Sequence, residues 1–311
     1  MEVSVVIPVY NAAKFLTQTV LSALEQSETS EVILIEDGST DNSLQVCIKL
    51  AEQFNNVRLL RHADAGNHGA GKSRNIGITN AKFEYISFLD ADDFFLENRF
   101  FTTKKVFADS PSIDGVYEAV GYYYENSKMQ NNSEIKLNTM SEIIPPEQLF
   151  EKQAPIGNSG YCCTDGWTVK RSIFDKTGLF DENLYLHQDT ALFIKFAALG
   201  RMFPGSLGKP IAMRRMHENN RITAVRTPKE RYKSLLLMWV TLWIWGKKKI
   251  NSSRQHIILN RLMHHIFHYK VEQKIGKIQQ ITRLLDLCRN YPILLSDRYF
   301  WQRLFKSNIQ E

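Results

Sequence analysis

Hydrophobic residues follow two alternating patterns along the first hundred positions of the chain. A continuous apolar run rich in β-branched residues predicts a buried strand at 3–9, and a second one at 32–35; further strands are expected at 57–60 and 85–89. Apolar residues at helical spacing predict a helix near 15–23, and we expect a second helix from about 43 to 54 and a short one near Arg74. Strands that alternate with helices in this way indicate an α/β fold with a Rossmann-like, doubly wound, mostly parallel sheet.

Polar residues gather where these predicted strands end. They are Tyr10 and Asn11 after the first strand, Asp37 after the second, and Asp90 and Asp92 after the fourth. Ligands of a doubly wound sheet bind beyond the carboxyl ends of its strands. The sequence therefore predicts a ligand site along one edge of the sheet.

The pattern changes twice further along the chain. Residues 111–225 are less regular, with a polar stretch at 126–139 that favours a loop and a helical pattern at 190–199. From Pro228 onward the spacing is helical. We therefore expect a first domain at 1–225, with halves at 1–110 and 111–225, and a C-terminal helical extension at 226–311.

Composition and charge add a contrast between these parts. A content of 43% hydrophobic and 23% charged residues is that of an ordinary soluble globular protein. Residues 226–311 contain 17 Lys and Arg against 5 Asp and Glu, a balance of +12, so with a total of +6 the rest carries −6. The basic extension predicts an acidic partner, and we expect no nucleic acid because no binding motif accompanies the charge.

The extension also combines apolar and cationic residues. Its apolar run at 235–245 contains Trp239, Trp243 and Trp245 and is followed by lysines at 247–249. The run is shorter than the about 20 residues that cross a bilayer. Tryptophan favours the headgroup level and cations attract anionic lipid, so 228–311 is a candidate contact with an anionic membrane. The alternative is packing on the first domain or on a second subunit of a homo-oligomer, because Trp239 and Trp243 have the spacing of core residues.

Targeting and redox features indicate a cytoplasmic protein. Met1 leads directly into the first predicted strand, without the pattern of a secretory signal. The four cysteines lack CxxC spacing, which argues against a zinc site or a disulfide framework and favours a reducing compartment. A membrane contact would then be peripheral, on the inner face of the plasma membrane.

Asp90 and Asp92 are candidates for metal binding. Carboxylates that emerge together from a strand end repel each other unless a cation or a proton neutralises them. Hard oxygen ligands suit Mg²⁺ or Mn²⁺, which also hold substrate phosphates. The alternative is that these aspartates only form the loop.

Residues 66–73 match the phosphate-binding P-loop pattern G-x-x-x-x-G-K-[ST]. A P-loop joins its strand directly to its helix, whereas residues 62–65 intervene here after the strand that ends at Leu60. The space for a helix after Ser73 is also short. A nucleotide hydrolase that uses Lys72 is therefore the rival function, and otherwise Lys72 is a solvated lysine of the loop.

Four motifs together resemble family 2 glycosyltransferases. They occur in the order and approximate spacing of that family, at 5–11 (VVIPVYN), 36–41 (EDGSTD), 73–77 (SRNIG) and 88–93 (FLDADD). The third motif departs from the usual A-R-N-x-G because Ser73 replaces the alanine. The resemblance covers residues 1 to about 225 and implies a GT-A fold, with a nucleotide-binding half followed by an acceptor-side half.

The resemblance also implies roles for individual residues. Contacts with the donor nucleotide are implied for Pro8, Val9, Tyr10, Asp37, Arg74, Asp90 and Ala91. Asp92 would hold Mg²⁺ or Mn²⁺, and His217, in a segment similar to the family's R-x-x-H, would reach the metal or the diphosphate. Asp189 matches the catalytic base of the family's E-D pair, in which Gln188 here replaces the Glu. The alternatives are a structural His217 and an Asp189 that only starts a helix.

A weaker match lies at Trp167, Lys170 and Arg171, which resemble an acceptor-side W-x-K-x-x-R segment. The alternative is a buried tryptophan flanked by solvated cations. As a whole, the resemblance implies an inverting, metal-dependent hexosyl- or N-acetylhexosaminyltransferase. Its donor would be a nucleotide-sugar, with UDP as the carrier because UDP is common in the family. Its acceptor would be a hydroxyl group of a saccharide or of a lipid-linked molecule, in cell-surface polysaccharide or glycolipid synthesis. A catalytically decayed nucleotide-sugar-binding protein is a further alternative because of Gln188.

Overall fold

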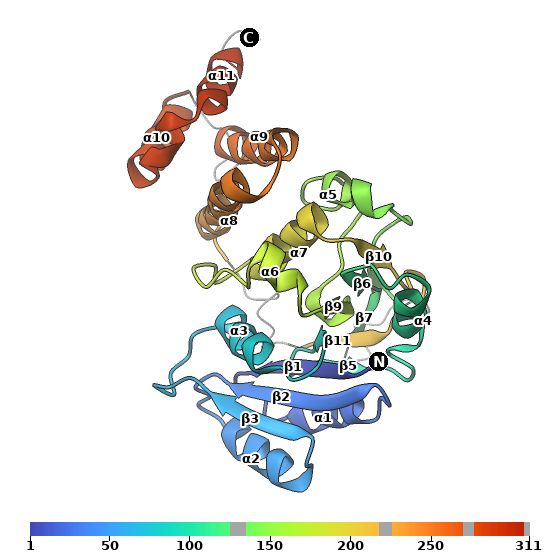
Figure 1. The fold of residues 1–311 in the computed structure, drawn as a ribbon. Helices are drawn as coiled ribbons and strands as arrows, with labels where there is room; N and C mark the ends of the chain where they lie inside the picture. Colours follow the sequence, from blue (N-terminus) through green and yellow to red (C-terminus); the bar gives the residue numbers. More distant parts are fainter. Residues whose placement is uncertain (125–134, 218–225, 270–276, 308–311) are drawn as a thin grey trace. The chain divides into compact units, whose positions relative to one another are not determined.

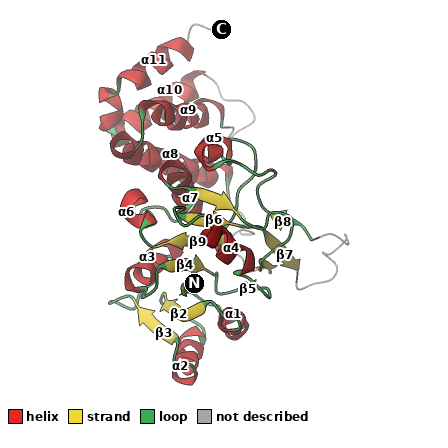
Figure 2. Ribbon diagram, turned by 45° about the vertical axis from the view of Figure 1, so that its right-hand side comes forward, coloured by secondary structure: helices red, strands yellow, loops and turns green. Residues whose placement is uncertain are grey.

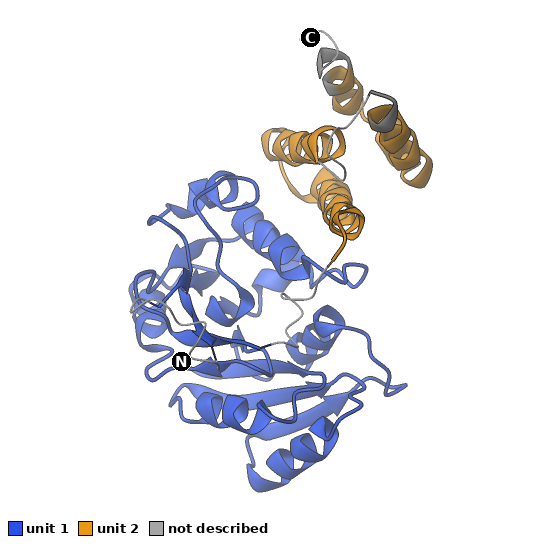
Figure 3. Cartoon of the chain, turned by 180° about the vertical axis from the view of Figure 1, so that it is seen from behind, with its two compact units in different colours: residues 1–224 blue, residues 225–311 orange. Residues whose placement is uncertain are grey.

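The structure is a computed structural model that describes residues 1–124, 135–217, 226–269 and 277–307. The chain divides into two compact units, Met1–Ala224 and Val225–Glu311 (Figure 3). Most of the loop expected at 126–139 lies outside the described residues.

A mostly parallel sheet forms the centre of the first unit. Within the described residues it has seven strands, in the order β10-β6-β9-β4-β1-β2-β3 (Figures 1 and 2). β9 runs antiparallel to both neighbours, and the other pairs are parallel. The strands are β1 (Val3–Val9), β2 (Thr29–Glu36), β3 (Val57–Arg61), β4 (Tyr85–Phe88), β6 (Gly115–Tyr117), β9 (Trp167–Lys170) and β10 (Met202–Pro204). The doubly wound α/β fold expected from the sequence is confirmed.

Helices cover both faces of this sheet. α1 (Leu16–Leu24) and α2 (Ser43–Gln53) contribute to the core on the face toward which Val5 and Ile7 point. Side chains alternate along a strand, so Val6 points the other way, toward α3 (Ala70–Asn80). There a Cβ at Gly77 would lie only 2.3 Å from Val6, so α3 packs very close to β1. All seven residues of β1 are buried, which explains its continuous apolar sequence.

The other described helices of the first unit pack around the second half of the sheet. They are α4 (Phe101–Asp109), η2 (Pro146–Gln148), α5 (Leu149–Lys152), η3 (Thr164–Gly166), α6 (Ile173–Thr177) and α7 (Gln188–Leu199). Trp167 is 1% exposed and stacks on Phe193 of α7, with ring centroids 5.2 Å apart. Its burial favours the packing interpretation over an acceptor contact.

A second, smaller sheet connects the loop after β4 to the end of the first unit. Its described strands are β5 (Phe94–Phe95), β11 (Ala212–Met216), β7 (Val120–Tyr124) and β8 (Leu137–Asn138), in that order. β5 begins directly after Asp93 and pairs antiparallel with β11, with Phe94 opposite Met213. This pairing brings the end of β11 back to the aspartates that follow β4.

The second unit is helical where it is described. It contains α8 (Pro228–Lys249), α9 (Ser252–His268), α10 (Lys277–Asn290), η4 (Pro292–Ser296) and α11 (Arg298–Ser307). α8 starts with a capping box, in which Thr227 and Glu230 each accept the other's backbone N–H. Trp239 and Trp243 are 4% and 0% exposed, which favours the packing alternative over membrane insertion for these two side chains. No helix in the described part of the chain combines the length and the apolar character needed to cross a membrane.

Candidate active site

The loop after β4 is held in place by hydrogen bonds from distant parts of the first unit. The Thr19 hydroxyl of α1 lies 2.9 Å from the carbonyl oxygen of Ala91 and 2.7 Å from that of Asp93. The backbone N–H of Asp90 donates to the carboxylate of Asp165 at 3.0 Å. These contacts fix the backbone from which the side chain of Asp92 projects.

Asp92 and His217 meet at this loop. His217 Nε2 lies 3.0 Å from Asp92 Oδ2, and the two side chains are 14% and 28% exposed. The backbone N–H of Arg215 donates to Asp93 at 2.7 Å, which secures β11 beside the loop. The structure therefore brings together the two residues expected to hold a metal ion, although 125 positions separate them.

The carboxyl groups around Asp92 make the loop strongly acidic. Burial, and then the charge of Asp90, raise the pKa of Asp92. Burial and the charge of Asp90 also raise the pKa of Asp165 to about 7. Asp90, Asp93 and Asp165 place carboxylate oxygens within 4.8 Å of one another. Carboxylates this close are stabilised by a bound cation or a proton.

A divalent cation fits the accessible donor atoms of Asp92 and His217. Asp93 and Asp165 are each 1% exposed, whereas Asp92 and His217 retain accessible atoms. Carboxylate oxygen and imidazole nitrogen are ligands that Mn²⁺ accepts, and Mg²⁺ accepts the carboxylate. Sequence reasoning missed Asp165, because it lies in no recognised motif and reaches Asp90 only through the fold.

The other expected nucleotide contacts border the same strand ends. Arg74 of α3 forms an ion pair with Asp90, and its guanidinium lies 5.4 Å from the ring centre of Phe180. Pro8 and Val9 are buried at the end of β1, while Tyr10 is 44% exposed. The structure thus aligns Tyr10, Arg74 and the acidic loop along one edge of the sheet.

Asp37 explains why residues 66–73 do not act as a P-loop. Its carboxylate accepts the backbone N–H groups of His68, at 2.8 Å, and Gly69, at 2.9 Å. In a P-loop such N–H groups cradle phosphate, but here a carboxylate of the protein occupies them. Lys72 lies in the first turn of α3, where its Nζ is 3.3 Å from His68 Nδ1. The nucleotide-hydrolase alternative is therefore not favoured.

Asp189 lies in the first turn of α7 and is partly exposed. Its Oδ1 accepts the backbone N–H of Thr190 at 2.8 Å. His187, the N-cap of α7, has a left-handed backbone with φ of 62°. Such strain in a non-glycine residue is common at functional sites.

Comparison with known proteins agrees with this geometry. The sequence profile described as Glycosyl transferase family 2 matches residues 4–178, more than half of the chain. The chain belongs to glycosyltransferase family 2. Among curated relatives, glycosyltransferase GlyG of Streptococcus pneumoniae serotype 4 is 30% identical over 198 residues, which cover 60% of this chain and 64% of GlyG.

A second curated relative extends the match further. The minor teichoic acid biosynthesis protein GgaA of Bacillus subtilis is 29% identical over 248 residues, which cover 75% of this chain and 52% of GgaA. This family 2 chain thus spans between about half and two thirds of the length of these relatives.

Solved structures show the same fold. TarS residues 1–349 of S. aureus, in complex with UDP-GlcNAc, superpose with a TM-score of 0.65 and 19% identity, over 93% of this chain and 81% of that one. The mannosyltransferase PcManGT from Pyrobaculum calidifontis, in complex with GDP-Man and Mn²⁺, gives a TM-score of 0.57 and 15% identity, over 99% and 79%. At these identities the likeness shows the GT-A fold alone.

Proposed function

We propose that this protein transfers a sugar from a nucleoside diphosphate donor to a hydroxyl group of a saccharide or lipid-linked acceptor, with inversion at the anomeric carbon. The contact between Asp92, after β4, and His217, after β11, carries this proposal, because the pair would hold a cation for a donor diphosphate. The name of GgaA supports a cell-surface polymer or glycolipid as the product. UDP is the carrier we favour, since the TarS structure holds UDP-GlcNAc.

The proposed reaction is a single displacement. Asp189 takes the proton of the acceptor hydroxyl while that oxygen attacks the anomeric carbon. The bond from this carbon to the diphosphate breaks, and the nucleoside diphosphate leaves with the electron pair. Asp92 and His217 would hold Mg²⁺ or Mn²⁺, which supplies positive charge for the leaving diphosphate.

The nucleotide would lie along the strand ends. Arg74 is fixed by its ion pair with Asp90, so it can contact the base while Asp90 and Ala91 border the ribose. Tyr10 offers an exposed ring beside the backbone of Pro8 and Val9. Asp37 would act indirectly, because its carboxylate already organises the loop at His68 and Gly69.

A donor screen tests this proposal. The 311-residue chain is incubated with Mn²⁺ and UDP-, GDP- or dTDP-sugars, and slow donor hydrolysis is measured. We expect turnover with one carrier and its loss in Asp92→Asn, with UDP binding in Mn²⁺ weakened by calorimetry. Asp109→Asn, at an exposed position at the end of α4, is the matched control. Equal UDP affinity and turnover in wild type and Asp92→Asn would exclude the metal role of Asp92.

We also propose that the basic C-terminal unit contacts an anionic membrane. Because Trp239 and Trp243 are buried, other side chains must supply the contact. Lys248 and Lys249 are exposed at the end of α8. Exposed apolar side chains lie on α10 and α11: Ile281, Leu285, Tyr299 and Trp301. Apolar side chains beside cations are what an interfacial contact requires.

A further inference from the structure

Phe15 lies against the ring of His217, one of the two residues that would hold a cation. The two ring centroids are 4.8 Å apart, and the ring planes are inclined by 35°. Phe15 is the N-cap residue of α1, and its backbone N–H donates to the carbonyl oxygen of Ala12 at 2.9 Å. The connection between β1 and α1 therefore supplies an aromatic face beside the His217 ring.

Arg215 is surrounded by three aromatic rings, one of which is Phe15. Its guanidinium carbon lies 4.8 Å from the ring centre of Phe15, 5.2 Å from that of Phe94 and 5.5 Å from that of Tyr123. Arg215 pairs with Tyr123 across β11 and β7, so both side chains emerge on the same face of the smaller sheet. Aromatic faces attract a guanidinium, and Arg215 is only 5% exposed, so the rings restrict the orientation of its plane.

The guanidinium of Arg215 also reaches the acidic loop. Its Nε donates to the carbonyl oxygen of Asp92 at 2.9 Å, and an Nη donates to Gln18 Oε1 at 2.7 Å. Ligands of a functional site must be held within about 0.5 Å of their productive positions. Arg215 holds the backbone of Asp92, and Phe15 contacts both Arg215 and the ring of His217.

We propose that Phe15 and Arg215 are positioning residues for the cation site, an inference that rests on the proposed function. Phe15 keeps the His217 ring in the orientation in which Nε2 faces Asp92, and Arg215 keeps the Asp92 backbone in place. Neither side chain can itself be a ligand, since a guanidinium has no acceptor and a phenyl ring has no polar atom. Residues that orient metal ligands contribute about 10- to 100-fold to metal affinity.

The gain in nucleotide affinity that a metal brings tests this proposal without turnover. UDP, or the nucleoside diphosphate that the donor screen selects, is titrated into the 311-residue chain by calorimetry in Mn²⁺ and in EDTA. The ratio of the two dissociation constants is the metal-dependent gain. We expect Phe15→Leu to reduce this gain by about tenfold and to leave the dissociation constant in EDTA unchanged. Phe15→Tyr keeps the ring and should retain the wild-type gain.

Arg215→Lys separates geometry from charge. Lysine keeps the positive charge beside the acidic loop but lacks the planar group that fits among the rings. We expect the metal-dependent gain to fall by about tenfold in this variant as well. A purely structural role would weaken binding equally in Mn²⁺ and in EDTA, which leaves the ratio unchanged. An unchanged ratio in Phe15→Leu or in Arg215→Lys would therefore overturn the positioning role of that residue.

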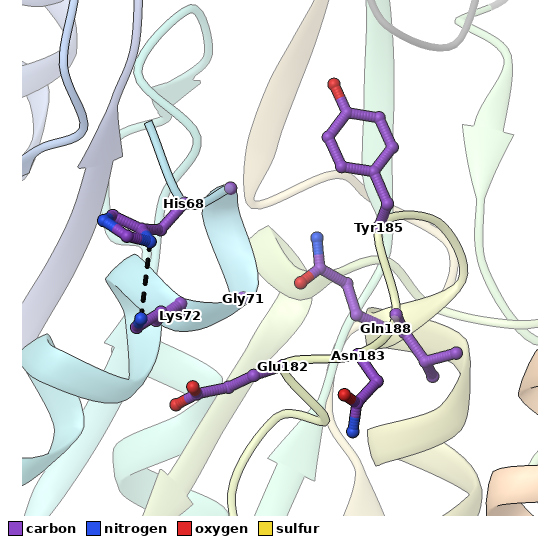
Figure 4. A pocket seen from close by; sticks show the side chains of 9 residues that line it. His68, Gly71, Lys72, Glu182, Asn183, Tyr185 and Gln188 are labelled. Atoms are coloured by element: carbon purple, nitrogen blue, oxygen red, sulfur yellow. Dashed lines mark hydrogen bonds between the residues drawn. The ribbon is translucent and has the colours of Figure 1, made fainter. Parts of the chain in front are cut away.

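Tyr185→Leu is the matched control, because it removes a 63% exposed ring away from this stack. Tyr185 lines a small pocket between the start of α3 and the segment that leads into α7 (Figure 4), and neither Phe15, Asp92 nor His217 lines that pocket. We expect the wild-type gain in this control, and an equal loss there would contradict the proposal. If wild type shows no gain, the metal role in the proposed function fails. A wild-type gain that Phe15→Leu and Arg215→Lys both retain overturns the positioning role alone.

Discussion

At the scale of single residues, the candidate active site contains carboxyl groups that the fold brings close to one another. Burial and the charge of Asp90 raise the pKa of Asp92, and His217 lies within hydrogen-bond distance of the Asp92 carboxylate. Under the proposed function, a bound cation would relieve the repulsion between these carboxylates. Asp189 lies in a different environment, in the first turn of α7, where its Oδ1 accepts the backbone N–H of Thr190.

Replacing Asp189 by Asn should separate binding from chemistry. The amide cannot accept the proton of the acceptor hydroxyl, so we expect turnover to fall by about 10²-fold or more. UDP affinity in Mn²⁺ should change little, because the metal pair is untouched. Steady-state transfer to the identified acceptor and calorimetry with UDP measure the two quantities. Asp175→Asn, at an exposed position of α6, controls for the loss of a surface charge. Near-wild-type turnover in Asp189→Asn would place the base elsewhere.

At the scale of elements, the segment between β3 and α3 is organised by buried polar contacts rather than by regular structure. His62 is 6% exposed, with Nε2 3.0 Å from Ser73 Oγ and 3.1 Å from Asp37 Oδ1. Asp37 in turn caps the backbone at His68 and Gly69. This network positions the start of α3, and with it Arg74, beside the acidic loop.

His62 should make the stability of the protein depend on pH. Burial lowers the pKa of His62 below its usual value of 6.5. As the pH falls through about 6.5, the unfolded chain binds a proton that the folded chain does not, so this contribution to stability decreases. We expect His62→Gln to lose less stability than wild type between pH 7.5 and 5.5 in urea unfolding. An identical loss in both proteins would show that the His62 pKa is not depressed.

At the scale of the whole molecule, the two units differ in charge and in kind. The first unit has the α/β fold and the acidic loop, and residues 226–311 carry the +12 balance on helices. Electrostatic attraction to anionic lipid contributes about 1 kcal/mol per cation near the surface. If the proposed membrane contact holds, a few exposed cations would be enough to concentrate the protein at an anionic surface.

Vesicle flotation tests this membrane contact. The 311-residue chain should float with vesicles that contain anionic lipid at low salt. It should be released at high salt, because screening weakens surface attraction. Lys248→Gln combined with Lys249→Gln should weaken binding by about tenfold or more, given the energy per cation. The pair Lys104→Gln and Lys105→Gln, exposed on α4, is the control. Protein that stays soluble at low salt would favour helix packing or a second subunit instead.

The sequence by itself determined the local part of this structure. The strands β1 and β2 follow from continuous apolar runs, because burial on two faces requires them, and α1 follows from apolar residues at helical spacing. The half-buried strand β3 and the helix α3 were expected further along the chain without such a pattern. The motifs at the strand ends led to the family, which the profile match confirms. These features depend on residues close in the chain.

Tertiary structure decided what distant residues do together. Trp239 and Trp243 looked equally suited to a membrane or a core, and only packing showed that they are buried. Residues 66–73 match the sequence pattern of a P-loop. The backbone N–H groups of His68 and Gly69 nevertheless donate to the carboxylate of Asp37, which lies about 30 positions earlier in the chain. Asp165 matches no motif in the sequence. Only the fold brings its carboxylate to the backbone N–H of Asp90, which donates a hydrogen bond to it. Sheet pairing and buried hydrogen bonds are long-range contacts, so periodicity along the chain cannot encode them.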